Sequence, residues 1–81
     1  MNTAQSRFEV GYPGYGVIEH VPSKHEAFLV AKNFCRRNGL DFVEVYDRMA
    51  HKGKTSLWKV NVTFVVMGGE TVCHQVWEEQ S

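Results

Sequence analysis

Residues 23–39 read SKHEAFLVAKNFCRRNG and predict the single helix of this 81-residue chain. Ser23 is a favourable N-cap, and Glu26 completes an S-x-x-E capping box, in which each side chain accepts a hydrogen bond from the other residue's backbone N–H. Gly39 supplies a left-handed exit at the C-terminal end. At about 100° per residue, one arc of this helix collects the apolar side chains Ala27, Phe28, Val30, Ala31, Phe34 and Cys35. This arc is expected to cover a sheet built from the rest of the chain.

The sequence that follows the helix alternates with a period of two, which is typical of strands. Two strands are expected at residues 40–49 and 56–67, joined by a four-residue turn at residues 51–54. Gly68-Gly69 is a strong signal for a tight hairpin, and a third strand is expected at residues 71–78. These turns predict an antiparallel meander.

The turns also predict which residues pair across the strands and which residues share a face. The predicted pairs are Val66–Thr71, Phe64–Cys73, Val62–Gln75 and Val60–Trp77 across the glycine turn, and Val45–Val60, Val43–Val62 and Asp47–Trp58 across the earlier turn. One face then forms a predicted core of Val43, Val45, Met49, Trp58, Val60, Val62, Phe64, Val66, Cys73 and Trp77. Asp47 falls on this face, where we expect a hydrogen bond or partial exposure to accommodate its carboxylate.

The N-terminal part of the chain is harder to place. Residues 1–7 are polar and are expected to be disordered, whereas residues 8–81 are expected to form one domain. Short strands at residues 8–10 and 16–21 flank Pro13-Gly14, which favours a type II turn. The expected fold class is α+β, with one helix packed on one face of a three- to five-stranded, mainly antiparallel sheet, in the order β-(β)-α-β-β-β.

The second face of the predicted sheet has no helix to cover it. It mixes charged side chains with six sizeable apolar ones, namely Phe42, Tyr46, Leu57, Val65, Val72 and Val76. Apolar side chains gathered on an open face predict a contact with a protein partner or with a second copy of the chain, as in a homodimer. Two alternatives remain: the N-terminal segment folds over part of this face, or the twist of the sheet scatters these residues.

The charges suggest a second hypothesis, nucleic-acid binding. Lys and Arg number nine, as do Asp and Glu, so the formal net charge is zero. Every basic residue lies at or before Lys59, whereas Glu70, Glu78 and Glu79 follow it. A basic helix face and a basic hairpin tip could follow a phosphate backbone through Lys32, Arg36, Arg37, Arg48, Lys52 and Lys54. The near-neutral pI of about 6.9 and the lack of a recognisable module argue against it.

Catalysis, cofactors and metals find little support in the sequence. The four histidines and two cysteines lack the spacing of a zinc site, so we expect no metal. Cys35 and Cys73 fall at positions expected to be buried, where a thiol is normally inert, and an enzyme would require one of them to be reactive. Reduced thiols and the lack of a long apolar run predict a cytoplasmic protein without a membrane span.

In size and expected architecture, the chain is similar to phage and mobile-element accessory proteins, such as inhibitors of host defence complexes. This similarity covers no specific motif and assigns no residue. Together with the open face, it favours a non-enzymatic protein-binding module that acts as an inhibitor or adaptor of a larger complex.

Overall fold

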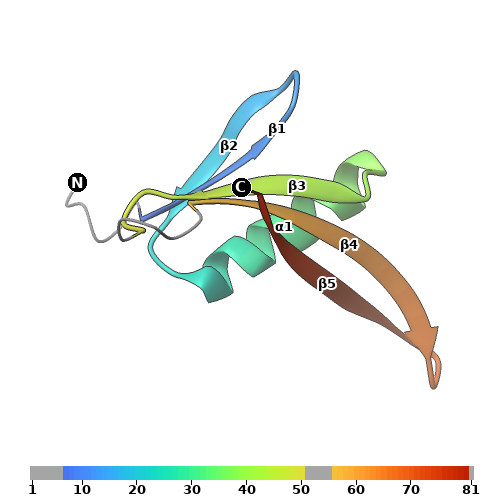
Figure 1. Cartoon of the computed structure of the whole chain (residues 1–81). Helices are drawn as coiled ribbons and strands as arrows, with labels where there is room; N and C mark the ends of the chain where they lie inside the picture. The colour runs from blue at the N-terminus through green and yellow to red at the C-terminus, as the bar shows by residue number, and fades with distance from the viewer. Residues whose placement is uncertain (1–6, 51–55, 81) are drawn as a thin grey trace.

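A computed structural model describes residues 7–50 and 56–80 of the chain. One helix packs against a five-stranded sheet with the strand order β2-β1-β3-β4-β5, and all neighbouring strands are antiparallel (Figure 1). The elements are β1 (Phe8–Tyr12), β2 (Gly16–Val21), α1 (Lys24–Asn38), β3 (Phe42–Asp47), β4 (Leu57–Met67) and β5 (Glu70–Gln80). The predicted α+β class is confirmed, and both N-terminal strands join the sheet.

The ends of α1 are capped as the sequence predicts. The Ser23 hydroxyl oxygen accepts a hydrogen bond from the Glu26 backbone N–H at 3.2 Å. The Glu26 carboxylate accepts a 3.5 Å hydrogen bond from the Ser23 hydroxyl, so the reciprocal half of the capping box runs between the two side chains. Gly39 has the left-handed φ of 64°, and its N–H donates to the Cys35 carbonyl, which ends the helix.

Strands β1 and β2 form the predicted N-terminal hairpin. The Tyr15 N–H donates to the Tyr12 carbonyl at 3.0 Å, and Gly14 takes a φ of 84°, as expected for the second central residue of a type II turn. The pairing shifts between Val10 and Gly11, and this bulge directs Ile18 toward the core. Because β1 then pairs along β3, the hairpin widens the sheet instead of folding over its open face.

The predicted register is confirmed between β4 and β5 but wrong between β3 and β4. The glycine turn gives the four expected pairs, from Val66–Thr71 to Val60–Trp77. Across the earlier connection, Val43 pairs with Val60 and Val45 with Trp58, a shift of two residues. The cause is Asp47, whose carboxylate accepts hydrogen bonds from the Met49 N–H and from Arg7 and thereby ends β3 before residue 49. An even shift keeps every side chain on its predicted face.

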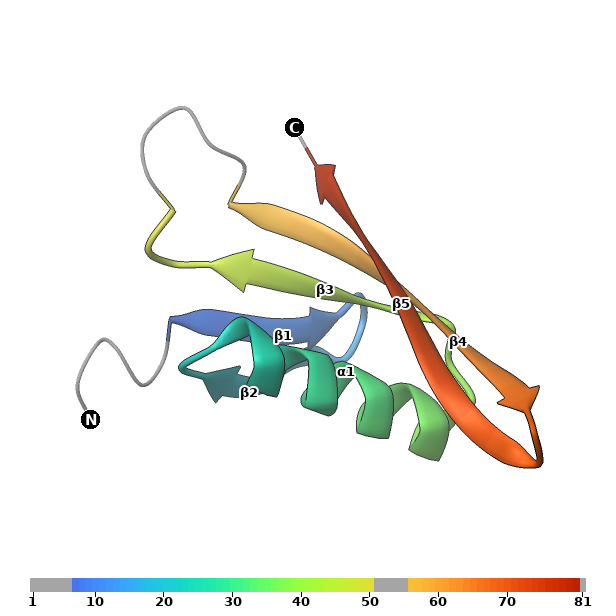
Figure 2. The same cartoon turned by 90° about the horizontal axis from the view of Figure 1, so that it is seen from below.

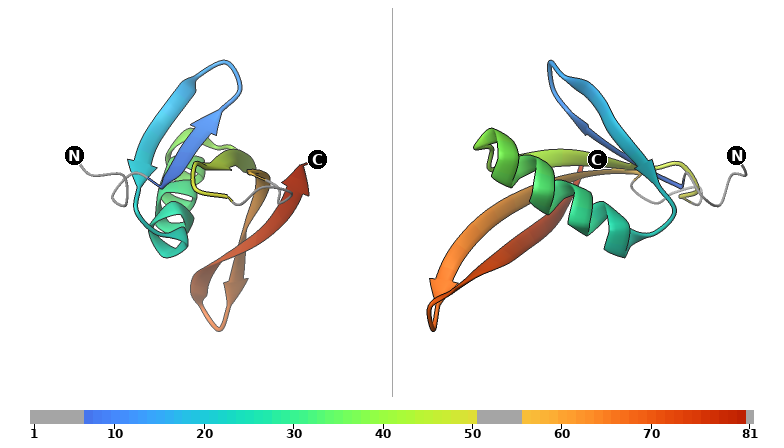
Figure 3. Two further views of the ribbon diagram at one scale, coloured as in Figure 1. Left: turned by 60° about the vertical axis from the view of Figure 1, so that its left-hand side comes forward. Right: turned by 180° about the vertical axis from the view of Figure 1, so that it is seen from behind.

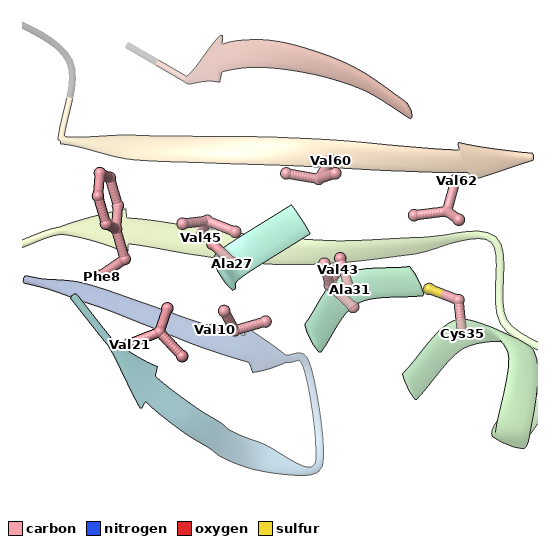
Figure 4. Packing of buried hydrophobic residues seen from close by; sticks show 10 residues of the cluster. All are labelled: Phe8, Val10, Val21, Ala27, Ala31, Cys35, Val43, Val45, Val60 and Val62. Carbon is pink, nitrogen blue, oxygen red and sulfur yellow. The ribbon is translucent and has the colours of Figure 1, made fainter. Parts of the chain in front are cut away.

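The core lies between α1 and one face of the sheet (Figure 2). Ala27 and Ala31 are fully buried, so the helix backbone lies close to the strands (Figure 4). The other buried apolar residues are Phe8, Val10, Val21, Cys35, Val43, Val45, Val60 and Val62, with Trp58, Phe64, Cys73 and Trp77 packed against them. Met49 and Val66 are 49% and 72% exposed, so their assignment to the core was wrong.

The sheet twists strongly, and its two hairpins diverge at opposite edges. Figure 3 shows the β1–β2 hairpin leaving in one direction and the β4–β5 hairpin in the other, with α1 in the angle between them. The glycine turn therefore extends past the helix, which explains the exposure of Val66 and Met67.

Candidate functional site

The sheet face opposite α1 carries the six apolar residues singled out in the sequence. Four of them have exposed fractions between 43% and 46%: Tyr46, Val65, Val72 and Val76. Phe42 and Leu57 are half-buried. Since no element of the described residues covers this face, the expected open face is present.

The strand register divides these residues into two groups. Tyr46 pairs directly with Leu57, and we call these two residues the aromatic end. Val65 pairs directly with Val72, with Val76 further along β5, and we call these three residues the valine end. The row formed by Glu44, Lys59 and Glu78 lies between the two groups, and the polar pair Thr63–His74 lies within the valine end, between Val76 and Val72. Polar rows therefore divide the apolar residues of this face into separate groups.

Phe42 is half-buried, and two neighbouring side chains pack against its ring. The Tyr12 ring lies 5.0 Å from the Phe42 ring, centroid to centroid. The Lys59 ammonium lies 4.9 Å from the same centroid, a favourable cation–π distance. The Phe42 ring is therefore engaged by contacts within the protein, with the Tyr12 ring and the Lys59 ammonium.

A hollow of about 260 Å³ lies beside the aromatic end. It is lined by Glu9, Gly11, Tyr12, Gly16, Val17, Glu44, Tyr46 and Leu57. Gly11 lies between Glu44 of β3 and Val17 of β2, and a Cβ added here would lie 3.1 Å from the Gly16 carbonyl oxygen, so the close approach of β2 favours glycine. The Glu9 carboxylate lies 3.5 Å from the His20 Nε2 at the rim. Two carboxylates and two tyrosine rings suit a basic side chain of a partner.

Sequence reasoning missed this hollow because it could not place β1 beside β3. Glu9 pairs with Tyr46, and Gly11 pairs with Glu44. In the sequence, the whole of α1 lies between the members of each pair.

Of the basic residues proposed to bind nucleic acid, the four in the described part of the chain are not all brought into one surface. Arg36 and Arg37 are exposed in the last turn of α1, close in sequence to the start of β3, whereas Arg48 follows the far end of that strand. Lys32 is half-buried. The remaining two predicted residues, Lys52 and Lys54, lie outside the described residues.

Both cysteines are free, and the two differ in burial. Cys35 is 1% exposed, and burial, followed by the nearby negative charge of Asp41, raises the pKa of its thiol to about 11. Cys73 is half-buried. Among residues 7–50 and 56–80, no group of three or more His, Cys, Asp and Glu side chains could hold a metal ion.

The one helix in the described part of the chain falls short of the length and apolarity needed to cross a membrane. Comparison of the chain with protein-family models, curated proteins and solved structures gives no match.

Proposed function

We propose that this protein is a non-enzymatic binding module that contacts a protein partner, or a second copy of itself, through the open face of its sheet. The observation that carries this proposal is the exposure of Tyr46, Val65, Val72 and Val76 on a face that no described element covers. Aromatic and aliphatic side chains beside polar rows are the composition of a contact surface with a polar rim.

Such a module would act as an inhibitor or adaptor of a larger complex. Its small size, 81 residues, fits that role. Two free cysteines support a reducing setting such as the cytoplasm.

Light scattering after size exclusion, at several protein concentrations and at low and high salt, is the first test. A dimer that persists in high salt indicates self-contact through apolar side chains, whereas a monomer leaves the face free for a foreign partner, which affinity capture then seeks. In either case, Tyr46→Glu and Val72→Lys should abolish the association and leave the circular dichroism spectrum native.

The matched control is Leu29→Glu, because Leu29 is 39% exposed on the outer side of α1, away from the open face. This variant should associate like the unmodified protein. Full association of Tyr46→Glu and Val72→Lys, or equal loss in Leu29→Glu, would contradict the open face as the contact.

Nucleic-acid binding is the second candidate, favoured by the exposure of Arg36 and Arg37 side by side in the last turn of α1. It predicts binding to labelled oligonucleotides that weakens steeply with added salt, because phosphate contacts release counterions. In fluorescence anisotropy, the double variant Arg36→Glu and Arg37→Glu should bind the oligonucleotide more weakly than the control double variant Glu78→Gln and Glu79→Gln. Salt-independent binding, or no binding at low salt, excludes this candidate.

A further inference from the structure

The two edges of the sheet differ in how well they are protected. Strand β2 is six residues long and carries the bulge opposite Val10 and Gly11. Strand β5 is eleven residues long and pairs with β4 at every position without a bulge. Between Thr71 and Trp77 it contains no proline and no Lys, Arg, Asp or Glu. Natural proteins normally blunt such an edge, because its free N–H and C=O groups can pair with another strand.

The glycine turn determines which backbone groups of β5 point outward. Met67 and Glu70 flank the two-residue loop and therefore form a hydrogen-bonded pair of the antiparallel ladder. Since such pairs alternate with non-bonded ones, the even-numbered residues of β5 bond to β4. The odd-numbered residues Thr71, Cys73, Gln75 and Trp77 turn their N–H and C=O groups to the outer edge. In the described chain, β5 pairs with β4 alone.

The helix side of β5 is held in place by polar contacts. The Gln75 side-chain N–H donates to the Phe28 carbonyl of α1 at 2.8 Å, and the Trp77 indole N–H donates to the Gln75 oxygen at 3.0 Å. The Lys24 ammonium lies 4.9 Å from the Trp77 ring centroid. These contacts orient the strand while leaving its outer edge open, so an added strand would meet a preorganised template.

The charge of β5 indicates what could pair with it. The strand carries Glu70, Glu78 and Glu79 and neither Lys nor Arg, and the Glu78 carboxylate accepts a 2.8 Å hydrogen bond from the Asn61 side-chain N–H. Self-pairing that aligns Val72 with Val76 of a second copy would place Glu70 opposite Glu78. Sliding by two residues would instead place Val72 opposite Glu78. Both arrangements cost free energy, because like charges repel and a carboxylate loses hydration beside a valine.

From these observations we infer that β5 takes a basic, extended segment of a protein partner as a sixth strand of the sheet. The inference rests on the proposed function, from which it takes the premise that the occupant is a protein partner. An antiparallel segment would place basic side chains opposite Glu78 and Glu70, and apolar side chains opposite Val76 and Val72. Main-chain hydrogen bonds to the odd-numbered residues of β5 hold the segment, and the valine end and the two carboxylates select its sequence.

The probe is the synthetic peptide acetyl-RTVTTTVTK-amide, which places its arginine opposite Glu78 and its lysine opposite Glu70. Titrated into the isotopically labelled protein, it should shift the backbone amide signals of Thr71, Cys73, Gln75 and Trp77 most strongly. A peptide with glutamate in place of the arginine and lysine is the charge control. It should bind at least roughly tenfold more weakly, because both of its carboxylates face those of β5.

N-methylation separates strand addition from simple docking on the face. Methyl groups on the fourth and sixth amides block the hydrogen bonds to β5 and should weaken binding roughly tenfold or more, since two backbone hydrogen bonds are lost. Methyl groups on the third and fifth amides point away from β5 and should leave the affinity within roughly threefold. Equal affinities for the two peptides would overturn the inference.

Protein variants complete the test. Glu78→Gln should weaken binding of the basic peptide and reduce its salt dependence, whereas Glu19→Gln on the opposite edge strand should change neither. Tyr46 lies on β3, two strands from β5, so Tyr46→Glu should leave peptide binding intact. This variant distinguishes failure of the open face as a contact from failure of the β5 edge as a docking site. Amide shifts absent from β5 at millimolar peptide, or a homodimer with protected β5 amides, would overturn the inference.

Discussion

The Arg7 guanidinium holds the Asp47 carboxylate through two hydrogen bonds, from Nε to Oδ1 and from Nη2 to Oδ2, both at 3.1 Å. Asp47 is buried on the core face, so its charge requires such a partner. The hydrogen bond from the Arg7 side chain and its attraction to the carboxylate also raise the pKa of Arg7, which keeps the guanidinium charged. The pair ties the start of β1 to the end of β3.

The first prediction concerns this pair. Asp47→Asn and Arg7→Gln should each lower the free energy of unfolding, because each removes the same interaction. The double variant should lose less than the sum of the two single losses. Urea denaturation of all four proteins measures the coupling, and strictly additive losses would show that the pair is not a unit.

Ala31 offers a test of the close approach between α1 and the sheet. It is fully buried, so Ala31→Leu must push the helix away from the strands and should destabilise the protein by about 1–3 kcal/mol. The control is Asn33→Leu, which adds a similar side chain at an exposed position of the same helix. Thermal or urea unfolding compares the two, and equal stabilities would argue against tight packing at Ala31.

The cysteines should react at different rates. Because burial raises the pKa of Cys35 to about 11, its thiol stays protonated near neutral pH, and alkylation should reach the half-buried Cys73 first. The raised pKa also favours the folded state below pH 9.0, and this contribution is lost as the pH rises toward 11. Mass spectrometry after timed iodoacetamide treatment measures both rates, and faster labelling of Cys35 would contradict its burial and revive a catalytic role.

Substitutions at the two residues of the glycine turn should have different effects on stability. Gly68 has a φ of 59°, which asparagine tolerates, so Gly68→Asn should leave stability nearly unchanged. Gly69 has a φ of 84°, so Gly69→Val forces a β-branched residue into the left-handed region and should cost about 1–2 kcal/mol. Chemical denaturation checks both variants, and equal effects would show that the turn relaxes to another type.

Local signals in the sequence predicted much of this fold. The capping residues Ser23 and Gly39 and the two-residue glycine turn each act over a few positions, and all three are confirmed. The register between β3 and β4 depends instead on Asp47, whose partner Arg7 lies 40 residues away in the sequence. The end of β3 at Asp47 therefore depends on a residue distant in the sequence, and the spacing of apolar residues alone cannot predict it.

The candidate site was predicted only in part, because part of it also depends on contacts between residues distant in the sequence. Period-two alternation assigned Tyr46, Val65, Val72 and Val76 to the exposed face, which the structure confirms as exposed positions. The hollow between Glu9 and Glu44 depends on pairing between β1 and β3, which no local pattern specifies. Whether these residues bind a partner stays a prediction.

The bulge in β2 bears on how assemblies of this protein would grow. Its irregular edge opposes further pairing, whereas the edge formed by β5 is continuous. A sheet that can be extended at one side only accepts a single neighbour, and the addition of that neighbour leaves no second docking edge on this chain. Complexes built through the sheet edge should therefore stop at a fixed stoichiometry of one strand per chain instead of polymerising into fibres.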